Sequence, residues 1–217
     1  GRTLVVKQKL PSTELAPLLT DVWTGSCVWE CSMLMNRIIE SEEMKQTFAG
    51  KQVLELGAGC GLSSIVACSE TDLARIITTD RGGMVELARS NALATLPAEK
   101  AARMTCMALS WGDDLPGVSE KIGQKAFDVI VASDVINPIY GTDSWPALAK
   151  TISFFSDENT LILLAYEQRE SEGPIEEDHL LNQFWRNCSD AGVFREATIV
   201  QEGEDRFVFR LKKTKTN

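Results

Sequence analysis

Histidine is almost absent from this sequence, and the cysteines lack the spacing of a metal site. Only His179 is a histidine among 217 residues, and no two of the six cysteines form a Cys-x-x-Cys pair. The cysteines are Cys27, Cys31, Cys60, Cys68, Cys106 and Cys188. Zinc and haem motifs need such pairs or nearby histidines. We therefore expect no metal site, and we expect reduced thiols that pack as small hydrophobic side chains in a cytoplasmic or nuclear protein.

Long apolar runs are also missing. No stretch approaches the roughly 18 apolar residues of a membrane helix, and the first residues lack the pattern of a secretory signal. We therefore expect no association with a membrane. We expect a chain of 217 residues to form a single domain, and we predict that the protein is a monomer. We place an N-terminal extension and lid at residues 1–50 and a core at residues 51–217.

Basic residues are too few to favour a nucleic acid partner. The chain has 22 Lys and Arg against 31 Asp and Glu, a net charge of −9. Binding of nucleic acid phosphates depends on Lys and Arg, whereas an acidic protein suits a cationic cofactor or a basic polypeptide. Residues 170–178 carry five acids around a Gly-Pro pair, and they predict either a solvated loop or a rim for a basic partner.

Apolar strand patterns alternate with helical patterns along most of the chain. We expect strands at residues 53–56, 74–80, 102–111, 125–134 and 159–169, and helices at 62–70, 82–96, 144–155 and 176–192. Residues 195–213 alternate about a Glu-Gly-Glu-Asp turn, which predicts a hairpin. The order predicts an α/β fold, a mostly parallel sheet with helices on both faces and an antiparallel C-terminal hairpin.

Three glycines at alternate positions follow the first predicted strand. Gly57, Gly59 and Gly61 come directly after Val53–Leu56, and Glu55 lies two residues before the first of them. Glycine adopts positive φ and lets other atoms approach the backbone. A loop between a strand and a helix also points free N–H groups at a ligand. Since a bare turn would need only one glycine, the pattern predicts a ligand site.

The spacing of these glycines discriminates between ligand classes. Nucleoside triphosphatases need Gly-Lys-Ser/Thr, but this chain has Gly61-Leu62-Ser63. Dinucleotide sites use Gly-x-Gly-x-x-Gly, and a carboxylate such as Glu55 would repel a pyrophosphate. S-adenosylmethionine has no phosphate and carries a sulfonium and an ammonium cation, so it fits best. Asp80, at the end of the second predicted strand, is placed to accept hydrogen bonds from ribose hydroxyls.

The motifs together resemble a known family. Glu-x-Gly-x-Gly-x-Gly at 55–61 followed by Asp80 resembles the seven-β-strand methyltransferases. Further motifs are VWECSMLM (28–35), SWG (110–112), VASDV (131–135) and AYEQR (165–169). As a set they resemble the methyltransferase-16 family, and within it most closely the valosin-containing-protein lysine methyltransferase group, over roughly residues 22–211. The resemblance implies a three-layer Rossmann-like sheet of seven strands.

The resemblance also implies cofactor-binding roles. The glycine loop would hold the methionine and ribose parts above Glu55, and Asp80 would take the ribose hydroxyls. The remaining cofactor residues are Arg81 and Trp111 beside the adenine, Trp29 at the methionine end, and Ser133. Two alternatives stay open: Trp29 as an ordinary core anchor at a helix start, and Trp111 as a loop plug.

The catalytic motif departs from the family pattern. These lysine methyltransferases carry Asp-x-x-Tyr after the fourth strand, whereas here Asp134 is followed by Asn137, and Tyr140 is the candidate replacement for the tyrosine. We assign Asp134, Asn137 and Tyr140 to orienting the amine of the substrate lysine. Asn-Pro-Ile-Tyr (137–140) is also similar to the Asn/Asp-Pro-Pro-Tyr of methyltransferases that act on amides or exocyclic amines. Glu167 and Arg169 are expected to brace the site, to meet the peptide, or to form a structural ion pair.

The resemblance implies an S-adenosylmethionine-dependent N-methyltransferase that acts on lysine side chains of a protein substrate. Methyl transfer is an in-line displacement for which the protein supplies alignment. The lysine amine must be neutral to attack, and water can take its proton. The alternatives are an amide or base amino N-methyltransferase, a non-catalytic cofactor-binding partner protein, or a small-molecule methyltransferase in which residues 170–178 form a lid.

Overall fold

The computed structural model describes residues 5–8, 24–141, 143–169, 173–203 and 205–214. The chain divides into two compact units, unit 1 at residues 1–109 and unit 2 at residues 110–217. Parts of the predicted lid (1–4 and 9–23) and of the acidic segment (170–172) lie outside the described residues. The single domain with its extension at 1–50 stays a prediction. Among the described helices, none combines the length and apolarity required to cross a bilayer.

Unit 1 is built on three parallel strands. They are β1 (Gln52–Leu56), β2 (Arg75–Asp80) and β3 (Met104–Ala108), in the order β3-β2-β1. Val53 and Leu54 are fully buried, as expected for a parallel strand whose apolar run is continuous. Leu54 pairs with Ile77, so the carboxyl ends of β1 and β2 lie at the same edge.

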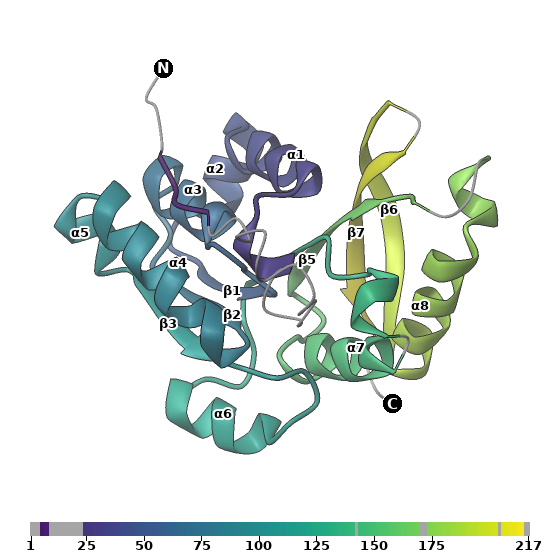
Figure 1. Ribbon diagram of the computed structural model, residues 1–217. Helices are drawn as coiled ribbons and strands as arrows, with labels where there is room; N and C mark the ends of the chain where they lie inside the picture. The colour runs from purple at the N-terminus through teal and green to yellow at the C-terminus, as the bar shows by residue number, and fades with distance from the viewer. Residues whose placement is uncertain (1–4, 9–23, 142, 170–172, 204, 215–217) are drawn as a thin grey trace, which may run out of the picture. The chain divides into compact units, whose positions relative to one another are not determined.

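Helices cover this part of the sheet (Figure 1). They are η1 (Thr24–Ser26), α1 (Glu30–Ile39), α2 (Glu42–Phe48), α3 (Leu62–Glu70), α4 (Gly82–Thr95) and α5 (Ala98–Ala101). Helix α4 packs on β2 and β3, and α3 packs on α1 and α4 and also contacts both strands. Helix α2 begins at Ser41, whose hydroxyl accepts a hydrogen bond from the Met44 N–H and so satisfies one of the free donors of the first turn.

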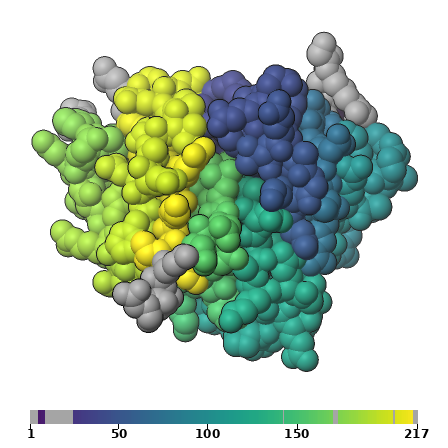
Figure 2. All heavy atoms as spheres, turned by 180° about the vertical axis from the view of Figure 1, so that it is seen from behind, coloured from purple at the N-terminus to yellow at the C-terminus, as the bar shows by residue number. Residues whose placement is uncertain are grey.

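Unit 2 combines two parallel strands with an antiparallel hairpin. Its strands, in the order β4-β5-β7-β6, are β4 (Val129–Ser133), β5 (Leu161–Glu167), β6 (Val193–Glu202) and β7 (Arg206–Lys213). Its helices are α6 (Leu115–Ile122), η2 (Pro138–Tyr140), α7 (Ser144–Phe154), η3 (Ile175–Glu177) and α8 (His179–Asp190). Strand β6 is outermost with residues 194–198 exposed, and Figure 2 shows the yellow hairpin at the surface.

A buried polar pair holds α8 to β5. The Tyr166 hydroxyl donates to Asp178 Oδ2 at 3.0 Å, and Asp178 Oδ1 accepts from the Leu181 N–H at the start of α8. Burial, together with the nearby Asp178 carboxylate, raises the pKa of Tyr166 well above its usual value, so the phenol remains the donor. Helix α8 also packs on α7 and β6.

The predicted fold class is confirmed. The described strands make one seven-stranded sheet, mostly parallel, whose last two strands form the antiparallel hairpin. The helix predicted at 62–70 has those bounds. Helices α2, α5 and α6 were missed, and a helix start at Trp29, the N-cap of α1, was given only as an alternative. The strand predicted at 125–134 begins only at Val129 because residues 125–128 lead into it as a loop.

The cysteines are packed as expected. All six are free thiols, and every one except Cys27 is buried. Burial raises the pKa of Cys60 and of Cys106 to about 11, so these thiols stay protonated and behave as small apolar side chains.

The N-terminal extension lies directly on the loop that follows β1. A Cβ atom added to Gly59 would stand 2.6 Å from the Gly25 carbonyl oxygen, closer than real Cβ atoms approach. Gly59 also has φ +54°, in the left-handed region. Two observations therefore require a glycine at position 59: its positive φ, and the Gly25 backbone that lies against it.

Asn91 of α4 joins the same loop to the start of the chain. Its buried Nδ2 donates to the Cys60 carbonyl at 2.9 Å and to the Lys7 carbonyl at 3.0 Å. Its Oδ1 accepts from the Lys7 N–H at 2.9 Å. One side chain therefore satisfies backbone groups of the loop and of residues 5–8.

A carboxylate is buried within the sheet of unit 1. Glu55 is only 3% exposed and accepts a hydrogen bond from the Ser64 hydroxyl, which in turn accepts one from Thr78 at 2.6 Å. Burial raises the pKa of Glu55 to about 7, and the Asp80 charge adds to the rise, while the hydrogen bonds from Ser64 oppose it.

We expect Gly59→Ala to destabilise the protein more than Gly50→Ala. Both glycines have positive φ, which costs an alanine about 1–2 kcal/mol, but a Cβ on Gly50 would meet nothing within 4 Å. Urea denaturation should show at least about 1 kcal/mol of additional loss for Gly59→Ala. Equal losses would show that residues 24–26 do not press on Gly59.

We expect Glu55 to make stability depend on pH. Its pKa rises on folding from 4.5 to about 7, so in that window the folded state holds a proton that the unfolded state releases. The free energy of unfolding therefore falls as pH rises, by on the order of 3 kcal/mol for about 2.5 pKa units. Glu55→Gln should remove this dependence. Denaturant titrations of both proteins between pH 4.5 and pH 7 test this, and parallel pH profiles would contradict it.

Candidate functional site

The loop after β1 forms a backbone cradle in unit 1. Gly57, Gly59 and Gly61 have φ values of +69°, +54° and +81°, so each adopts the conformation for which glycine was expected. The Gly61 N–H donates to the Ala58 carbonyl at 2.8 Å, and α3 begins at the next residue. The Ala58 N–H donates to the Thr79 carbonyl at 3.0 Å, so the loop stays joined to β2.

Asp80 fixes the tip of this cradle. Its Oδ2 accepts from the Gly59 N–H and its Oδ1 from the Arg81 N–H, both at 2.7 Å. Burial raises the pKa of Asp80, while the two backbone donors act in the opposite direction. A carboxylate oxygen accepts more than one hydrogen bond, so Asp80 can still bind ligand hydroxyls. That Asp80 anchors the glycine loop was not predicted from the sequence.

The other residues predicted in unit 1 have local structural roles. Glu55 lies in the buried network with Ser64 on α3, and its carbonyl accepts from the Thr79 hydroxyl at 2.6 Å. Trp29 is half-buried and forms the N-cap of α1, where its carbonyl accepts from the Ser32 N–H. Arg81 forms the N-cap of α4. Their predicted contacts with the cofactor stay predictions.

In unit 2, Asp134 occupies an unusual position at the end of β4. It has φ +59°, and its N–H donates to the Ala165 carbonyl of β5 at 2.9 Å. Aspartate tolerates this left-handed conformation better than most residues, and such positions concentrate at functional sites. Its side chain is only 2% exposed.

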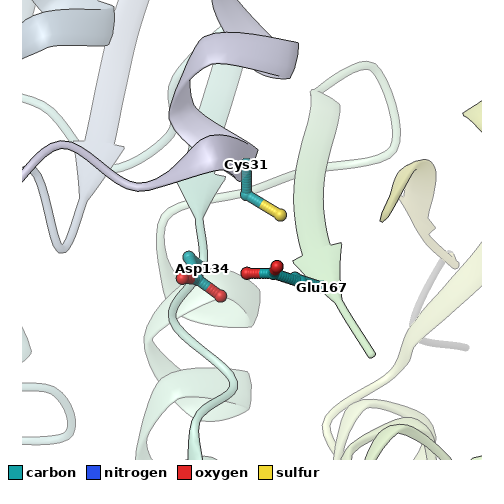
Figure 3. Close-up of side chains that lie close together, drawn as sticks. All are labelled: Cys31, Asp134 and Glu167. Carbon is teal, nitrogen blue, oxygen red and sulfur yellow. The ribbon is translucent and has the colours of Figure 1, made fainter. Parts of the chain in front are cut away.

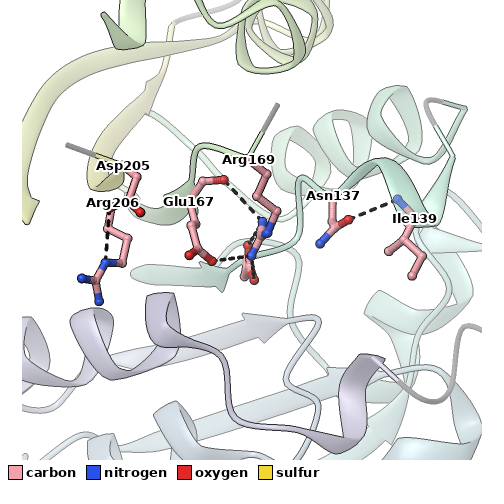
Figure 4. A network of polar contacts seen from close by, with 7 residues as sticks. Asn137, Ile139, Glu167, Arg169, Asp205 and Arg206 are labelled. Carbon is pink, nitrogen blue, oxygen red and sulfur yellow. Dashed lines mark hydrogen bonds and ion pairs between the residues drawn. The ribbon is translucent and has the colours of Figure 1, made fainter. Parts of the chain in front are cut away.

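Arg169 holds Asp134 with two parallel hydrogen bonds. Nη1 donates to Oδ1 at 2.7 Å and Nη2 to Oδ2 at 2.5 Å. Nη2 also donates to Glu167 Oε2 at 2.6 Å (Figure 4). A bidentate, charge-assisted pair of this kind fixes the plane of the carboxylate. The sequence left three possibilities open for Arg169 and Glu167: bracing the site, meeting the peptide, or forming a structural ion pair.

Asn137 caps the turn that carries Tyr140. Its Oδ1 accepts from the Ile139 N–H at 3.1 Å (Figure 4). Its carbonyl accepts from the Tyr140 N–H at 3.1 Å. The Tyr140 ring meets the Trp111 ring edge to face, with centroids 6.3 Å apart and an interplanar angle of 86°. The structure therefore brings together two aromatic residues to which the sequence assigned separate roles.

Ser133 has a buried hydroxyl oxygen with no hydrogen-bond partner among the described residues. Most buried polar atoms in folded proteins are paired, so an unpaired one fits a position that a polar ligand or water completes.

Among the predicted residues, Asp80 thus lies with Gly59 and Arg81 in unit 1, and Trp111 with Tyr140 in unit 2. The missed residues are Gly25, Ser64 and Asn91, whose contacts join separate elements of the fold and leave no local motif.

Comparison with known proteins identifies the family. A family model described as "Lysine methyltransferase" matches residues 18–183. The chain is 29% identical to the protein N-lysine methyltransferase METTL21A of Danio rerio and 32% identical to that of Mus musculus, over 65% of this chain and 60% of each relative. It is 26% identical to the histidine protein methyltransferase 1 homolog of Rattus norvegicus, over 97% of this chain and 65% of that protein. The match thus spans about three fifths of the length of the METTL21A proteins.

Solved structures agree on the fold. Magnesium protoporphyrin IX methyltransferase from Synechocystis has a TM-score of 0.63 at 15% identity, over 89% of this chain and 86% of that chain. Fibrillarin from Aeropyrum pernix has a TM-score of 0.60 at 13% identity, over 84% and 76%. The finer resemblance to the valosin-containing-protein group stays a prediction. With the family model covering residues 18–183, the chain belongs to the methyltransferase-16 family of lysine methyltransferases.

Proposed function

We propose that this protein transfers the methyl group of S-adenosylmethionine to a lysine side chain of a protein substrate. The observation that carries the proposal is the family match over residues 18–183. Relatives named protein N-lysine methyltransferase METTL21A and EEF1A lysine methyltransferase 3 support the same substrate class. The family assignment also confirms the cofactor predicted from the sequence, S-adenosylmethionine.

The residues of unit 1 fit such a cofactor. Positive φ at the three glycines leaves the loop without side chains, and the Asp80 carboxylate lies at its tip. Asp80 would take the ribose hydroxyls, and the loop backbone the methionine and ribose parts. We further assign Arg81 to the adenine and Trp29 to the methionine end. From unit 2, we assign Trp111 to the adenine, and Ser133, with its unpaired buried hydroxyl, to a polar group of the cofactor. When bound, S-adenosylmethionine supplies a methyl group activated by a sulfonium cation.

The residues of unit 2 would position the amine. A free lysine has a pKa near 10.4 and must lose its proton before it attacks. Asp134, held in one plane by Arg169, offers a fixed carboxylate, and the Tyr140 hydroxyl and the Asn137 amide can complete the alignment. Water accepts the proton, so no dedicated base is needed.

The remaining expectations concern where and with what the protein works. We propose a monomer that acts in the cytoplasm, and also in the nucleus, on protein substrates. The six free thiols support a reducing compartment. The net charge of −9 supports a basic polypeptide partner rather than a nucleic acid.

A second candidate function is methylation of a protein histidine. It is favoured by the similarity to the rat histidine protein methyltransferase 1 homolog, which extends over 97% of this chain. Amide or base amino methylation is the other alternative, because Asn-Pro-Ile-Tyr at 137–140 is similar to the Asn/Asp-Pro-Pro-Tyr of methyltransferases that act on amides or exocyclic amines.

Incubation with radiolabelled S-adenosylmethionine and a cell lysate, followed by mass spectrometry of the labelled proteins, tests the proposal. We expect methyl groups on lysine, and none when S-adenosylhomocysteine is present in excess. Label on histidine or glutamine alone would favour the second candidates. Cofactor binding without any transfer would indicate a non-catalytic partner protein.

We expect Asp80→Ala to weaken cofactor binding by about 1.5–3 kcal/mol, since charge-assisted bonds to ribose hydroxyls and the anchor of the Gly59 N–H are both lost. Asp80→Asn keeps one acceptor oxygen and should lose less. Calorimetry with S-adenosylhomocysteine measures both, with NADH as a ligand that should not bind. Unchanged affinity of Asp80→Ala for S-adenosylhomocysteine would show that Asp80 only caps the end of β2.

We expect Asp134→Asn to reduce turnover at least about tenfold while cofactor affinity changes little, because alignment of the amine is lost and each ~1.4 kcal/mol is a factor of ten. Tyr140→Phe should also lower turnover if its hydroxyl contacts the amine. Methylation assays on an identified lysine substrate measure both variants. Full activity in Asp134→Asn would exclude the assigned role.

A further inference from the structure

Two carboxylates of unit 2 form ion pairs with the same cation, Arg169. Oxygens of Asp134 and Glu167 lie within 4.8 Å of each other, and Figure 3 shows the two groups turned toward one another. Arg169 binds both, at 2.5 Å to Asp134 and 2.6 Å to Glu167. The two acids and the guanidinium together carry one net negative charge.

The two carboxylates differ in which of their oxygens already accept hydrogen bonds. Both oxygens of Asp134 accept from Arg169, and the side chain is 2% exposed. Glu167 accepts from Arg169 through Oε2 alone, and its side chain is 23% exposed. Among the described residues, Glu167 Oε1 has no hydrogen-bond donor. The open acceptor of the cluster is therefore on Glu167.

The chemistry of the missing partner follows from the charge. A partly buried net negative charge is costly unless a cation compensates it. An ammonium group supplies one positive charge and three N–H donors. It can therefore donate to Glu167 Oε1 and balance the net negative charge of the cluster. A neutral amide would leave the charge uncompensated.

We propose that Glu167 binds the ammonium group of the substrate lysine, and that Arg169 positions both carboxylates for it. This inference rests on the proposed lysine methylation and adds to it a specificity-determining residue. Glu167 acts in binding, before the amine loses its proton to water, so its contribution appears in KM rather than in kcat. Asp134 remains the fixed neighbour that keeps Arg169, and hence Glu167, in place.

Steady-state kinetics on the lysine protein labelled most strongly in the lysate tests this, after that protein has been identified and purified. Glu167→Gln should raise its KM about tenfold or more, since a charge-assisted bond is replaced by a neutral one. We expect kcat within about threefold of the wild type and the same affinity for S-adenosylhomocysteine. Glu120→Gln on α6, an exposed glutamate, is the matched control for the loss of one negative charge and should behave as wild type. Glu167→Asp, which keeps the charge on a shorter side chain, should give an intermediate KM, and it serves alone if Glu167→Gln does not fold.

Several outcomes would overturn the inference. A wild-type KM in Glu167→Gln, or in Glu167→Asp where that variant alone folds, excludes the role. A parallel fall in kcat, cofactor affinity and melting temperature would make Glu167 a purely structural brace. If the wild type methylates no lysine, the proposed function fails and this inference with it. If the wild type methylates lysine but the Glu167 variants retain its KM, only this inference fails.

Discussion

The hydrogen bond from the Gly59 N–H to the Asp80 carboxylate is the interaction on which the candidate cofactor site depends. It joins the loop after β1 to the end of β2, two strands paired in parallel register up to Leu56 and Thr79. Without it, a loop with three positive-φ glycines would have many accessible conformations, because glycine restricts the backbone least. Burial of a carboxylate is normally unfavourable, but two backbone N–H donors offset part of that cost here.

The same loop is constrained from its other sides. Gly25 lies against Gly59 so closely that no side chain fits between them. Asn91 connects Cys60 to the backbone of Lys7. Gly25 and Lys7 of the N-terminal extension are thus part of the structure around the loop.

In unit 2, one arginine organises the acidic residues. Two carboxylates within 4.8 Å would repel each other, and Arg169 offsets that repulsion by donating to both. The three side chains together carry one net negative charge. The left-handed conformation of Asp134 directs its side chain into this cluster. Asn137 and Tyr140 follow in a turn closed by the Asn137 side chain, so the departure from Asp-x-x-Tyr has a structural consequence: the residue at the tyrosine position caps the turn.

The sequence by itself determined the order of the strands along the chain, the hairpin and the cofactor class. These depend on local information: apolar periodicity gave α3 its observed bounds, and glycine spacing marked the loop whose three φ values are positive. Only the tertiary structure decided which polar groups pair. Asp134 and Arg169 are 35 residues apart, and Lys7 and Asn91 are 84 apart. Such contacts depend on which strands and helices become neighbours, and that is a property of the folded sheet rather than of any short stretch of chain.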